Sequence, residues 1–177
     1  MGKLIATAQA TLDGVVDPVG EWVQPDGDHG DHSFERQSRS GGMLLGRKTF
    51  EGLAAYWPDK QGKWADMVNA IPKYVGSNTL SGELPWNGTL LEGALEDSVP
   101  KLKDEVDGDL FMHGSGEFAH TLAEKGLVDV FEVYLNPIVW GEANLHVLGD
   151  RGVVRLELSD VQRFDSGVVL LTYLPKL

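Results

Sequence analysis

The chain of 177 residues is 42% hydrophobic and 24% charged, proportions typical of one globular domain and not of a disordered segment. Its 27 acidic residues outnumber the 15 basic ones, and the resulting formal net charge of −12 disfavours nucleic acids and anionic membranes as partners. Cysteine is absent, which excludes disulfide bonds, a thiol nucleophile and cysteine-ligated metals.

The first apolar segment, residues 4–12, precedes the turn signal Asp13-Gly14 and predicts a buried strand. The run from Met1 soon reaches polar residues at Gln9 and Asp13, so it is too short for the apolar core of a secretory signal. No stretch of the chain approaches the roughly 18 consecutive apolar residues of a membrane span. We therefore expect a cytoplasmic protein that acts on a small-molecule substrate, with no nucleic-acid or membrane partner.

The next elements are short. Residues 17–31 are rich in Asp, Gly and Pro and predict a loop. A short helix is expected over residues 31–40, because the pair Gly41-Gly42 would end it. The apolar run 43–45 predicts an interior strand, and residues 49–56 predict a helix.

The second half of the chain alternates short strands with helices and then ends in strands alone. Helices are expected over residues 98–106, with Pro100 in the first turn, and over 117–125. Strands are expected over residues 73–76, 89–91, 110–112, 130–139, 154–158 and 168–174. This order predicts a single α/β domain over residues 1–177, with a mostly parallel central sheet, helices on both faces and an antiparallel C-terminal edge.

Two places in the sequence share a short buried strand, a glycine turn and a helix. The first glycine turn, residues 46–49, reads Gly-Arg-Lys-Thr, and the second, residues 114–116, reads Gly-Ser-Gly. A helix N-terminus attracts phosphate through unpaired N–H groups and its positive dipole end, and glycine lets a ligand approach the backbone. Either turn alone could simply reverse the chain, but two in one domain favour a dinucleotide site. Neither matches the Rossmann or Walker fingerprint.

A dense group of polar residues, Asp28, His29, Asp31 and His32, also suggests a metal site. Ligand types packed so closely in a Gly-rich segment are more often simply polar, and no distant third histidine has supporting spacing. We therefore expect no metal. His113 ends a predicted buried strand and is interpreted as a core histidine.

Several motifs resemble the dihydrofolate-reductase-like superfamily. They are Leu12-Asp13-Gly14, the run Leu-Gly-Arg-Lys-Thr-Phe-Glu at 45–51, and Gly-Ser-Gly-Glu at 114–117. Residues 122–129 and 137–141 resemble the branch named for the C-terminal reductase domain of the bifunctional riboflavin-biosynthesis enzyme (the RibD C-terminal domain). The resemblance covers nearly the whole chain. It implies the three-layer dihydrofolate-reductase-like fold, reductase activity and NADPH as cofactor.

The resemblance also implies which residues hold the cofactor. The adenosine half, its phosphates, its ribose and the pyrophosphate would contact Gly46, Arg47, Lys48, Thr49, Ser77, Asn78, Gly114, Ser115 and Gly116. Glu117 stands where many relatives carry a basic residue just beyond the second glycine turn. Because an anion there opposes a phosphate, NADH is an open alternative to NADPH.

For catalysis, the resemblance places a carboxylate on the helix before the first glycine turn. Asp31 lies fifteen residues before Gly46, one residue off the spacing in dihydrofolate reductase, and is our first candidate. Glu35, one helical turn further on, and Asp28 are the alternatives, and all three could instead be solvated acids of a helix end. Phe34 is the candidate for stacking on a flat substrate ring.

The branch implies reduction of a substrate like 5-amino-6-(5-phosphoribosylamino)uracil, as in riboflavin biosynthesis, or of a related pyrimidine or pterin. A phosphorylated substrate would need basic residues near the predicted helix, where Arg36 and Arg39 are the nearby candidates. The alternative function is a nucleotide-binding sensor or regulatory protein that retains the NADPH site without catalysis. Pairing through the C-terminal strands, common in the family, implies a homodimer.

Overall fold

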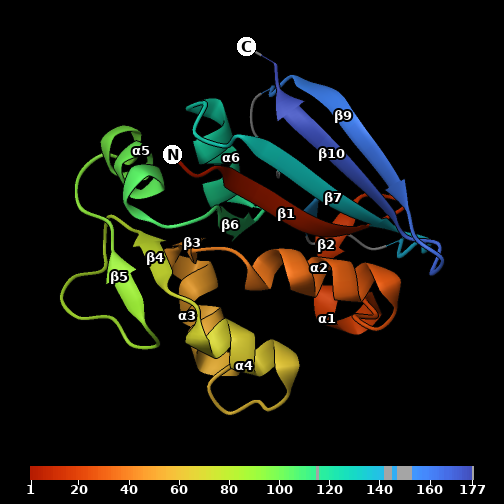
Figure 1. The fold of residues 1–177 in the computed structure, drawn as a ribbon, viewed down its shortest axis with the longest axis horizontal. Helices are drawn as coiled ribbons and strands as arrows, with labels where there is room; N and C mark the ends of the chain where they lie inside the picture. Colours follow the sequence, from red (N-terminus) through yellow and green to blue (C-terminus); the bar gives the residue numbers. More distant parts are fainter. Residues whose placement is uncertain (115, 142–144, 147–152, 177) are drawn as a thin grey trace.

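The computed structural model describes every residue except 115, 142–144, 147–152 and 177. Its centre is an eight-stranded sheet (Figure 1). In spatial order the strands are β5 (Gly88–Leu90), β4 (Lys73–Gly76), β3 (Gly42–Gly46), β6 (Leu110–His113), β1 (Leu4–Thr11), β7 (Val130–Asn136), β10 (Val169–Pro175) and β9 (Leu156–Arg163). The first six run parallel, whereas β10 is antiparallel to both β7 and β9. The predicted mostly parallel sheet with an antiparallel C-terminal edge is confirmed.

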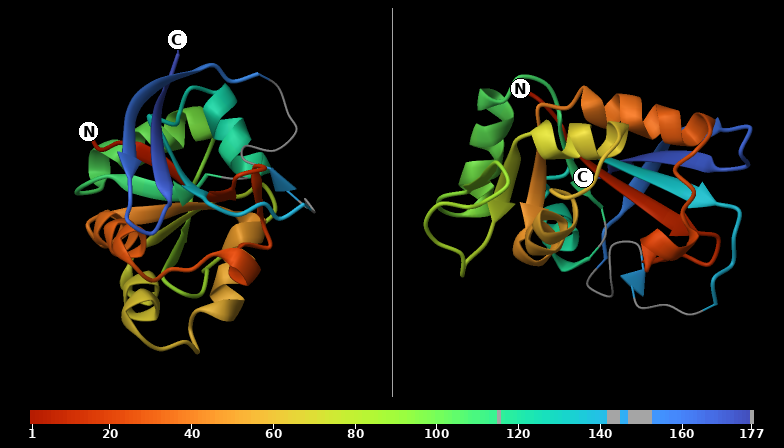
Figure 2. Two further views of the ribbon diagram at one scale, coloured as in Figure 1. Left: turned by 90° about the vertical axis from the view of Figure 1, so that its right-hand side faces the viewer. Right: turned by 90° about the horizontal axis from the view of Figure 1, so that it is seen from below.

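Helices cover both faces of the sheet, as the views in Figures 1 and 2 show. On one face lie α2 (Asp28–Ser38), α3 (Arg47–Tyr56) and α4 (Lys63–Ala70), and on the other lie α5 (Leu95–Glu105) and α6 (Glu117–Glu124). A single turn, α1 (Val19–Trp22), precedes α2, and β2 (Val15–Asp17) pairs with β8 (Leu145–His146) in a separate two-stranded sheet.

The two layers of helices explain why β3, in the middle of the parallel strands, is apolar throughout and buried at every position. Successive side chains of a strand point to opposite faces, so a strand covered on both sides has no position for a solvated residue. In β3, Leu44 packs toward Val99 of α5 and Leu122 of α6. Its neighbour Leu45 packs toward Phe50 of α3 and Val68 of α4.

Five expectations about element boundaries were wrong, and one of them is the strand predicted at residues 154–158, because β9 spans Leu156–Arg163. The segment predicted as a loop, residues 17–31, contains α1 and the first four residues of α2. Helix α4 was not predicted, although Ala65 and Val68 are buried at helical spacing. Because α5 begins at Leu95, Pro100 lies inside the helix rather than in its first turn. Strand β7 ends at Asn136, since Pro137 has no N–H group to continue the pairing.

The turn after β1 is held by the side chain of Asp13. Its carboxylate accepts hydrogen bonds from the Thr11 hydroxyl at 2.6 Å and from the backbone N–H groups of Trp140 at 3.1 Å and Gly141 at 2.8 Å. These donors favour the charged form and lower the pKa of Asp13 to about 2. The Asp13-Gly14 turn therefore fixes the segment that follows β7 beside the C-terminal end of β1.

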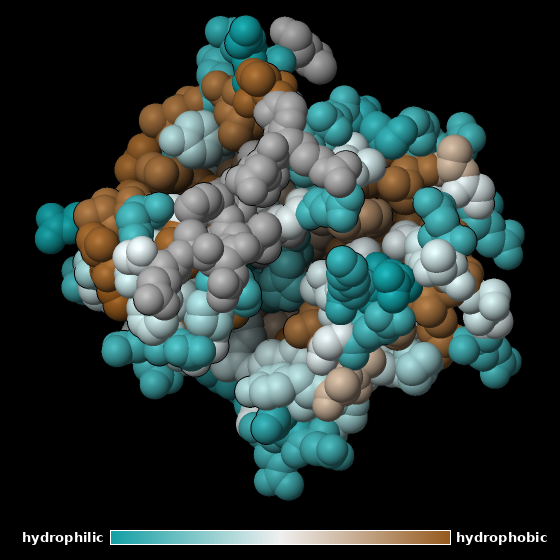
Figure 3. All heavy atoms as spheres, turned by 180° about the vertical axis from the view of Figure 1, so that it is seen from behind, coloured by the Kyte–Doolittle hydropathy of each residue, from teal (hydrophilic) through white to brown (hydrophobic). Residues whose placement is uncertain are grey.

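The C-terminal strands form an exposed edge of the sheet. Leu158 and Val161 of β9 are 51% and 53% exposed, and hydrophobic residues gather over β9 and β10 at the upper left of Figure 3. This surface suits the expected homodimer, which stays a prediction. In the described part of the chain, no helix is long and apolar enough to cross a membrane.

Candidate functional site

The structure brings the two glycine turns together. Strands β3 and β6 are parallel neighbours in the sheet, so the turns that follow them open at the same edge. Helix α3 begins after Gly46 and helix α6 begins after Gly116. A glycine at this position has no side chain to accept hydrogen bonds from the first-turn N–H groups. Two helix N-termini are therefore available to an anionic ligand at one place.

A cleft of about 1160 Å³ lies at this edge of the sheet. Most of the predicted cofactor residues line it, namely Gly46, Arg47, Lys48, Thr49, Ser77, Asn78 and Gly116. The middle of β1 forms another part of its wall through Thr7, Ala8 and Gln9. The volume is slightly above that of ordinary ligand pockets, which suits a molecule as large as a dinucleotide. Ser115 lies outside the described residues.

The glycines of the cleft allow the chain to pack against itself. Gly46 and Gly76 are partners in the β3–β4 register, and the Phe118 side chain lies over both. A Cβ atom on Gly46 would come within 2.9 Å of Phe118 Cβ and Cγ. Gly114 is buried against β1, where its Cβ would lie 3.0 Å from the carbonyl carbon of Ala6. The contacts of Gly114 are thus with β1, and it is not among the described residues that line the cleft.

Positive charge at the cleft comes from both glycine-turn helices. Arg47 Nη1 donates to Glu51 at 3.2 Å along α3, and Lys48 is exposed. Lys125, just after α6, also lines the cleft and pairs with Glu96 of α5. The sequence analysis missed Lys125, because nothing local connects the end of α6 to a phosphate site. His113 lines the cleft and is accessible from it, although the surrounding protein lowers its pKa, so it is not the enclosed core histidine that the sequence suggested.

The Ser77 hydroxyl shapes the loop that follows β4. It accepts hydrogen bonds from the backbone N–H groups of Thr79 at 3.1 Å and Leu80 at 3.0 Å. Its role toward the cofactor ribose stays a prediction.

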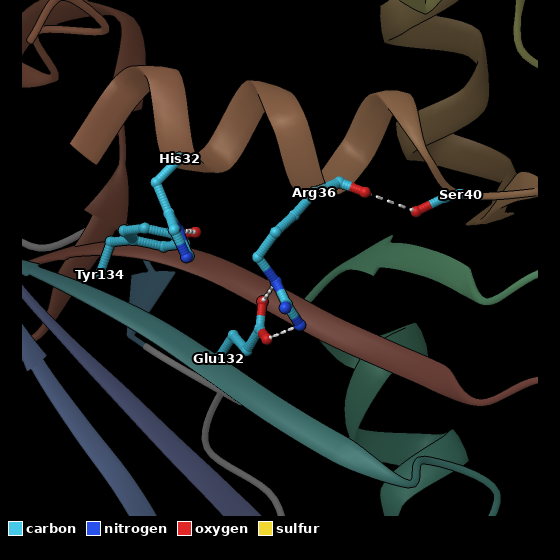
Figure 4. Close-up of polar contacts among 5 residues, drawn as sticks. All are labelled: His32, Arg36, Ser40, Glu132 and Tyr134. Atoms are coloured by element: carbon cyan, nitrogen blue, oxygen red, sulfur yellow. Dashed lines mark hydrogen bonds and ion pairs between the residues drawn. The ribbon is translucent and has the colours of Figure 1, made fainter. Parts of the chain in front are cut away.

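A second cavity, of about 470 Å³, lies between α2 and strands β1, β6 and β7. Thr7 lines both cavities, so they meet at β1. Figure 4 shows His32 and Arg36 descending from α2 toward Tyr134 and Glu132 of β7. Arg36 donates to Glu132 through Nε at 3.2 Å and through Nη2. His32 Nδ1 and the Tyr134 hydroxyl are 3.0 Å apart.

Burial governs the electrostatics of this second cavity. The Glu132 side chain is 5% exposed, and burial raises its pKa although Arg36 opposes the shift. Burial, reinforced by Arg36, lowers the pKa of His32, which favours the neutral imidazole near pH 7. Burial also raises the pKa of Tyr134, so this hydroxyl keeps its proton.

Of the residues predicted for catalysis and substrate stacking, only Glu35 belongs to the described lining of a cavity. Asp31 is 72% exposed and accepts a hydrogen bond from Lys63 Nζ at 2.7 Å. Phe34 packs edge-on against Trp64 at 5.2 Å between ring centroids. Neither Asp31 nor Phe34 belongs to the described lining of the two cavities. Glu35 does line the second cavity, but its carboxylate pairs with Arg39. All three roles stay predictions.

The third candidate acid, Asp28, connects α2 to the β9–β10 turn. Its carboxylate accepts from the backbone N–H groups of Asp165 at 2.6 Å and Ser166 at 3.3 Å.

Glu132 was missed by the sequence analysis. Its signal was a charged residue within an otherwise apolar stretch of a predicted strand. Among the described residues, no three His, Asp or Glu side chains gather as a metal site.

The chain is similar to known proteins along nearly its whole length. The sequence model of the RibD C-terminal domain family matches residues 2–170. The uncharacterized protein YyaP of Bacillus subtilis (strain 168) is 27% identical over 179 residues, covering 97% of this chain and 94% of YyaP. A putative riboflavin biosynthesis protein from Shewanella sp. PV-4 has a TM-score of 0.71 at 20% identity, over 100% of both chains. Dihydrofolate reductase from Enterococcus faecalis, in complex with NADP(H), has a TM-score of 0.59 at 17% identity, over 99% of this chain and 98% of its own. These two structures show a fold of the dihydrofolate-reductase type.

Proposed function

Because the chain belongs to the RibD C-terminal domain family, we propose that it is an NADPH-dependent reductase of a pyrimidine, pterin or related ring. The dinucleotide would lie in the larger cleft, and the ring to be reduced would lie in the second cavity under α2. The observation that carries this proposal is the pair of glycine-led helix N-termini, α3 and α6, that open side by side on one cleft.

When bound, NADPH supplies a hydride to the substrate. The protein has to hold the phosphates and bring the substrate ring alongside. Arg47, Lys48 and Lys125 provide positive charge at the cleft, and the first turns of α3 and α6 provide N–H donors. Thr7 lines both cavities, so a ring bound under α2 would lie next to a dinucleotide held in the larger cleft. Glu117 also lines the cleft. Its negative charge opposes the extra phosphate of NADPH, so NADH is the alternative cofactor.

The proposal is tested by measuring binding of NADPH and NADH, and then NADPH oxidation with a panel of pyrimidines and pterins. We expect NADPH to bind about tenfold more tightly than NADH or better, because three basic side chains, Arg47, Lys48 and Lys125, line the cleft. Arg47 and Lys125 are held only by exposed ion pairs, which a phosphate can replace at little cost. At least one ring compound should accelerate NADPH oxidation. Absence of binding by either nucleotide would contradict the assignment of the cleft.

Of the two acids predicted to be catalytic, Glu35 is the one that borders the second cavity. We therefore expect Glu35→Gln to slow hydride transfer by about 10²-fold or more, within the usual range for a positioned acid or base. Asp31→Asn is the matched variant on the same helix, and it should retain turnover within a few-fold. Both variants should keep the affinity for NADPH, because neither residue lines the cleft as described. The opposite ranking in single-turnover kinetics would assign the role to Asp31.

A second candidate function is a sensor that binds the nucleotide without turning it over. The observation in its favour is that Asp31 and Glu35 are both engaged in ion pairs, with Lys63 and Arg39. Tight NADPH binding with no oxidation across the whole substrate panel would support the sensor.

A further inference from the structure

Acidic side chains outnumber basic ones in the lining of the second cavity. Its lining contains three carboxylates, Glu35, Asp109 and Glu132, and two guanidinium groups, Arg36 and Arg39. Each arginine already has an acidic partner, since Arg36 pairs with Glu132 and Arg39 pairs with Glu35. Among the described lining residues, no arginine or lysine is therefore left without a carboxylate partner.

Helix α2 adds to this negative balance. The residues that it contributes begin at His32, and the lining continues past its C-terminal end to Arg39 and Ser40. The C-terminal end of a helix carries a partial negative charge, which disfavours an anion. The opposite end of α2 carries Asp28, whose carboxylate is engaged with the β9–β10 turn. Helix α2 therefore offers no anion site to the cavity.

A phosphate monoester carries a charge of about −1.5 to −2 near pH 7 and is normally bound by arginines, lysines or helix N-termini. Arg39 pairs with Glu35 at an exposed site, so it could meet a phosphate, but only at the exposed C-terminal end of α2, beside the Glu35 carboxylate. To bind such a group deeper in the cavity, Arg36 would have to leave Glu132, whose carboxylate would then remain buried and unpaired. Leaving the buried Glu132 carboxylate without its cation in this way is strongly unfavourable. The cavity is thus poorly suited to the phosphoribosyl group of the substrate that the family resemblance implies.

The remaining lining suits a flat polar ring. Ile5 and Phe111 provide apolar surface, and the Thr7 and Ser33 hydroxyls provide neutral hydrogen-bonding groups. The ion pair with Arg36 favours the charged form of Glu132, whose two oxygens together accept about four hydrogen bonds. Arg36 occupies two of these acceptor sites through Nε and Nη2.

We infer that the second cavity binds an uncharged or cationic nitrogen heterocycle with N–H or amino donors, and discriminates against the phosphorylated form of the same compound. Glu132, positioned by Arg36, is the specificity-determining residue. The inference rests on the proposed function, because it takes the second cavity to be the substrate site. It narrows that function to substrates without a phosphate.

The test compares two matched pairs of ligands by isothermal titration calorimetry. One pair is 5-amino-6-(ribosylamino)uracil and its 5′-phosphate, and the other is 7,8-dihydroneopterin and its monophosphate. The protein is titrated without nucleotide and again with NADP⁺, which has no hydride to transfer. We expect the unphosphorylated member of at least one pair to bind about fivefold more tightly or better. A smaller preference, a preference for the phosphate, or no binding by any of the four compounds would overturn the inference.

Variants at Glu132 test its part in the preference. Glu132→Gln removes one carboxylate and frees Arg36, so the preference should fall by about fivefold or more. Glu132→Asp keeps the charge and should retain the preference. The control is Glu105→Gln, which makes the same change in net charge at an exposed ion pair on α5. An unchanged preference in Glu132→Gln, or an equal loss in Glu105→Gln, would overturn the role of Glu132.

The two proposals fail in distinguishable ways. If NADPH and NADH do not bind, the proposed reductase function fails, whereas the preference measured without nucleotide still tests the cavity. If NADPH binds and the phosphorylated ligand is preferred, the reductase function stands and the present inference fails.

Discussion

Replacing Gly46 with valine is expected to abolish NADPH binding, raising its Kd by about 100-fold or more. A Cβ atom at residue 46 would lie 2.9 Å from Phe118 Cβ, an atom attached directly to the backbone of α6. A rotation of the phenyl ring cannot relieve this contact, so the first turn of α6 must move away from α3. The two helix N-termini that form the phosphate site would then separate. Calorimetric titration with NADPH measures the effect.

The matched control is Gly20→Val in α1, where an added Cβ meets no atom within 4 Å. This variant should bind NADPH as the parent does. Circular dichroism of Gly46→Val should retain the spectrum of a mixed α/β protein, because the sheet is held by the interior strands. Normal NADPH affinity in a folded Gly46→Val protein would refute the assignment of the first glycine turn to the cofactor.

Replacing Lys73 with methionine is expected to stabilise the protein near neutral pH. Lys73 is 0% exposed in β4, with its Nζ 4.0 Å from the centre of the Trp86 ring and 3.2 Å from the Asn69 carbonyl oxygen. In the described part of the chain, no carboxylate lies within ion-pair distance of this Nζ. Burial lowers the pKa of Lys73 from 10.5 to about 8.

The difference in pKa corresponds to at most about 3 kcal/mol at neutral pH, of which we expect Lys73→Met to recover about 1–3 kcal/mol. Between about pH 8 and pH 10.5 the folded parent has released this proton, whereas the unfolded chain still holds it. The stability contributed by this residue therefore rises with pH across that window. Urea unfolding near pH 7 and near pH 10 should show the advantage of the variant shrinking at the higher pH. An advantage independent of pH would contradict the proposed charge burial.

Lys103→Met is expected to change the free energy of unfolding in the opposite direction. Lys103 is also buried, but its Nζ donates to the Leu127 carbonyl oxygen at 2.7 Å and pairs with Asp129. Its removal leaves the partly buried Asp129 carboxylate without its cation, so we expect a destabilisation of about 1–3 kcal/mol. The pair of variants separates the effect of an unpaired buried lysine from that of a paired one.

Local patterns in the sequence were enough to predict most of the strands and both glycine turns. The apolar run at the start of the chain became β1, and the Gly-Arg-Lys-Thr and Gly-Ser-Gly segments both lead from a strand into a helix. The alternation of a strand, the spacing of a helix and the glycine that ends it all involve residues that are close together in the chain. These patterns can therefore be recognised in a single sequence. The predicted ends of helices were wrong where a proline is compatible with more than one position in a helix. Pro100 suggested a helix start, although α5 had already begun at Leu95.

Only the tertiary structure decided which side of α2 faces the sheet. Asp31 and Arg36 are five residues apart, and at 3.6 residues per turn they project from different sides of the helix. Both sides of α2 carry charged residues, so the polarity of the sequence did not indicate the buried one. Arg36 turns inward because Glu132, 96 residues away on β7, lies beneath it in the sheet. Such a pairing depends on which strand lies beneath α2 in the folded sheet. The residues next to Arg36 or Glu132 in the sequence do not specify that arrangement.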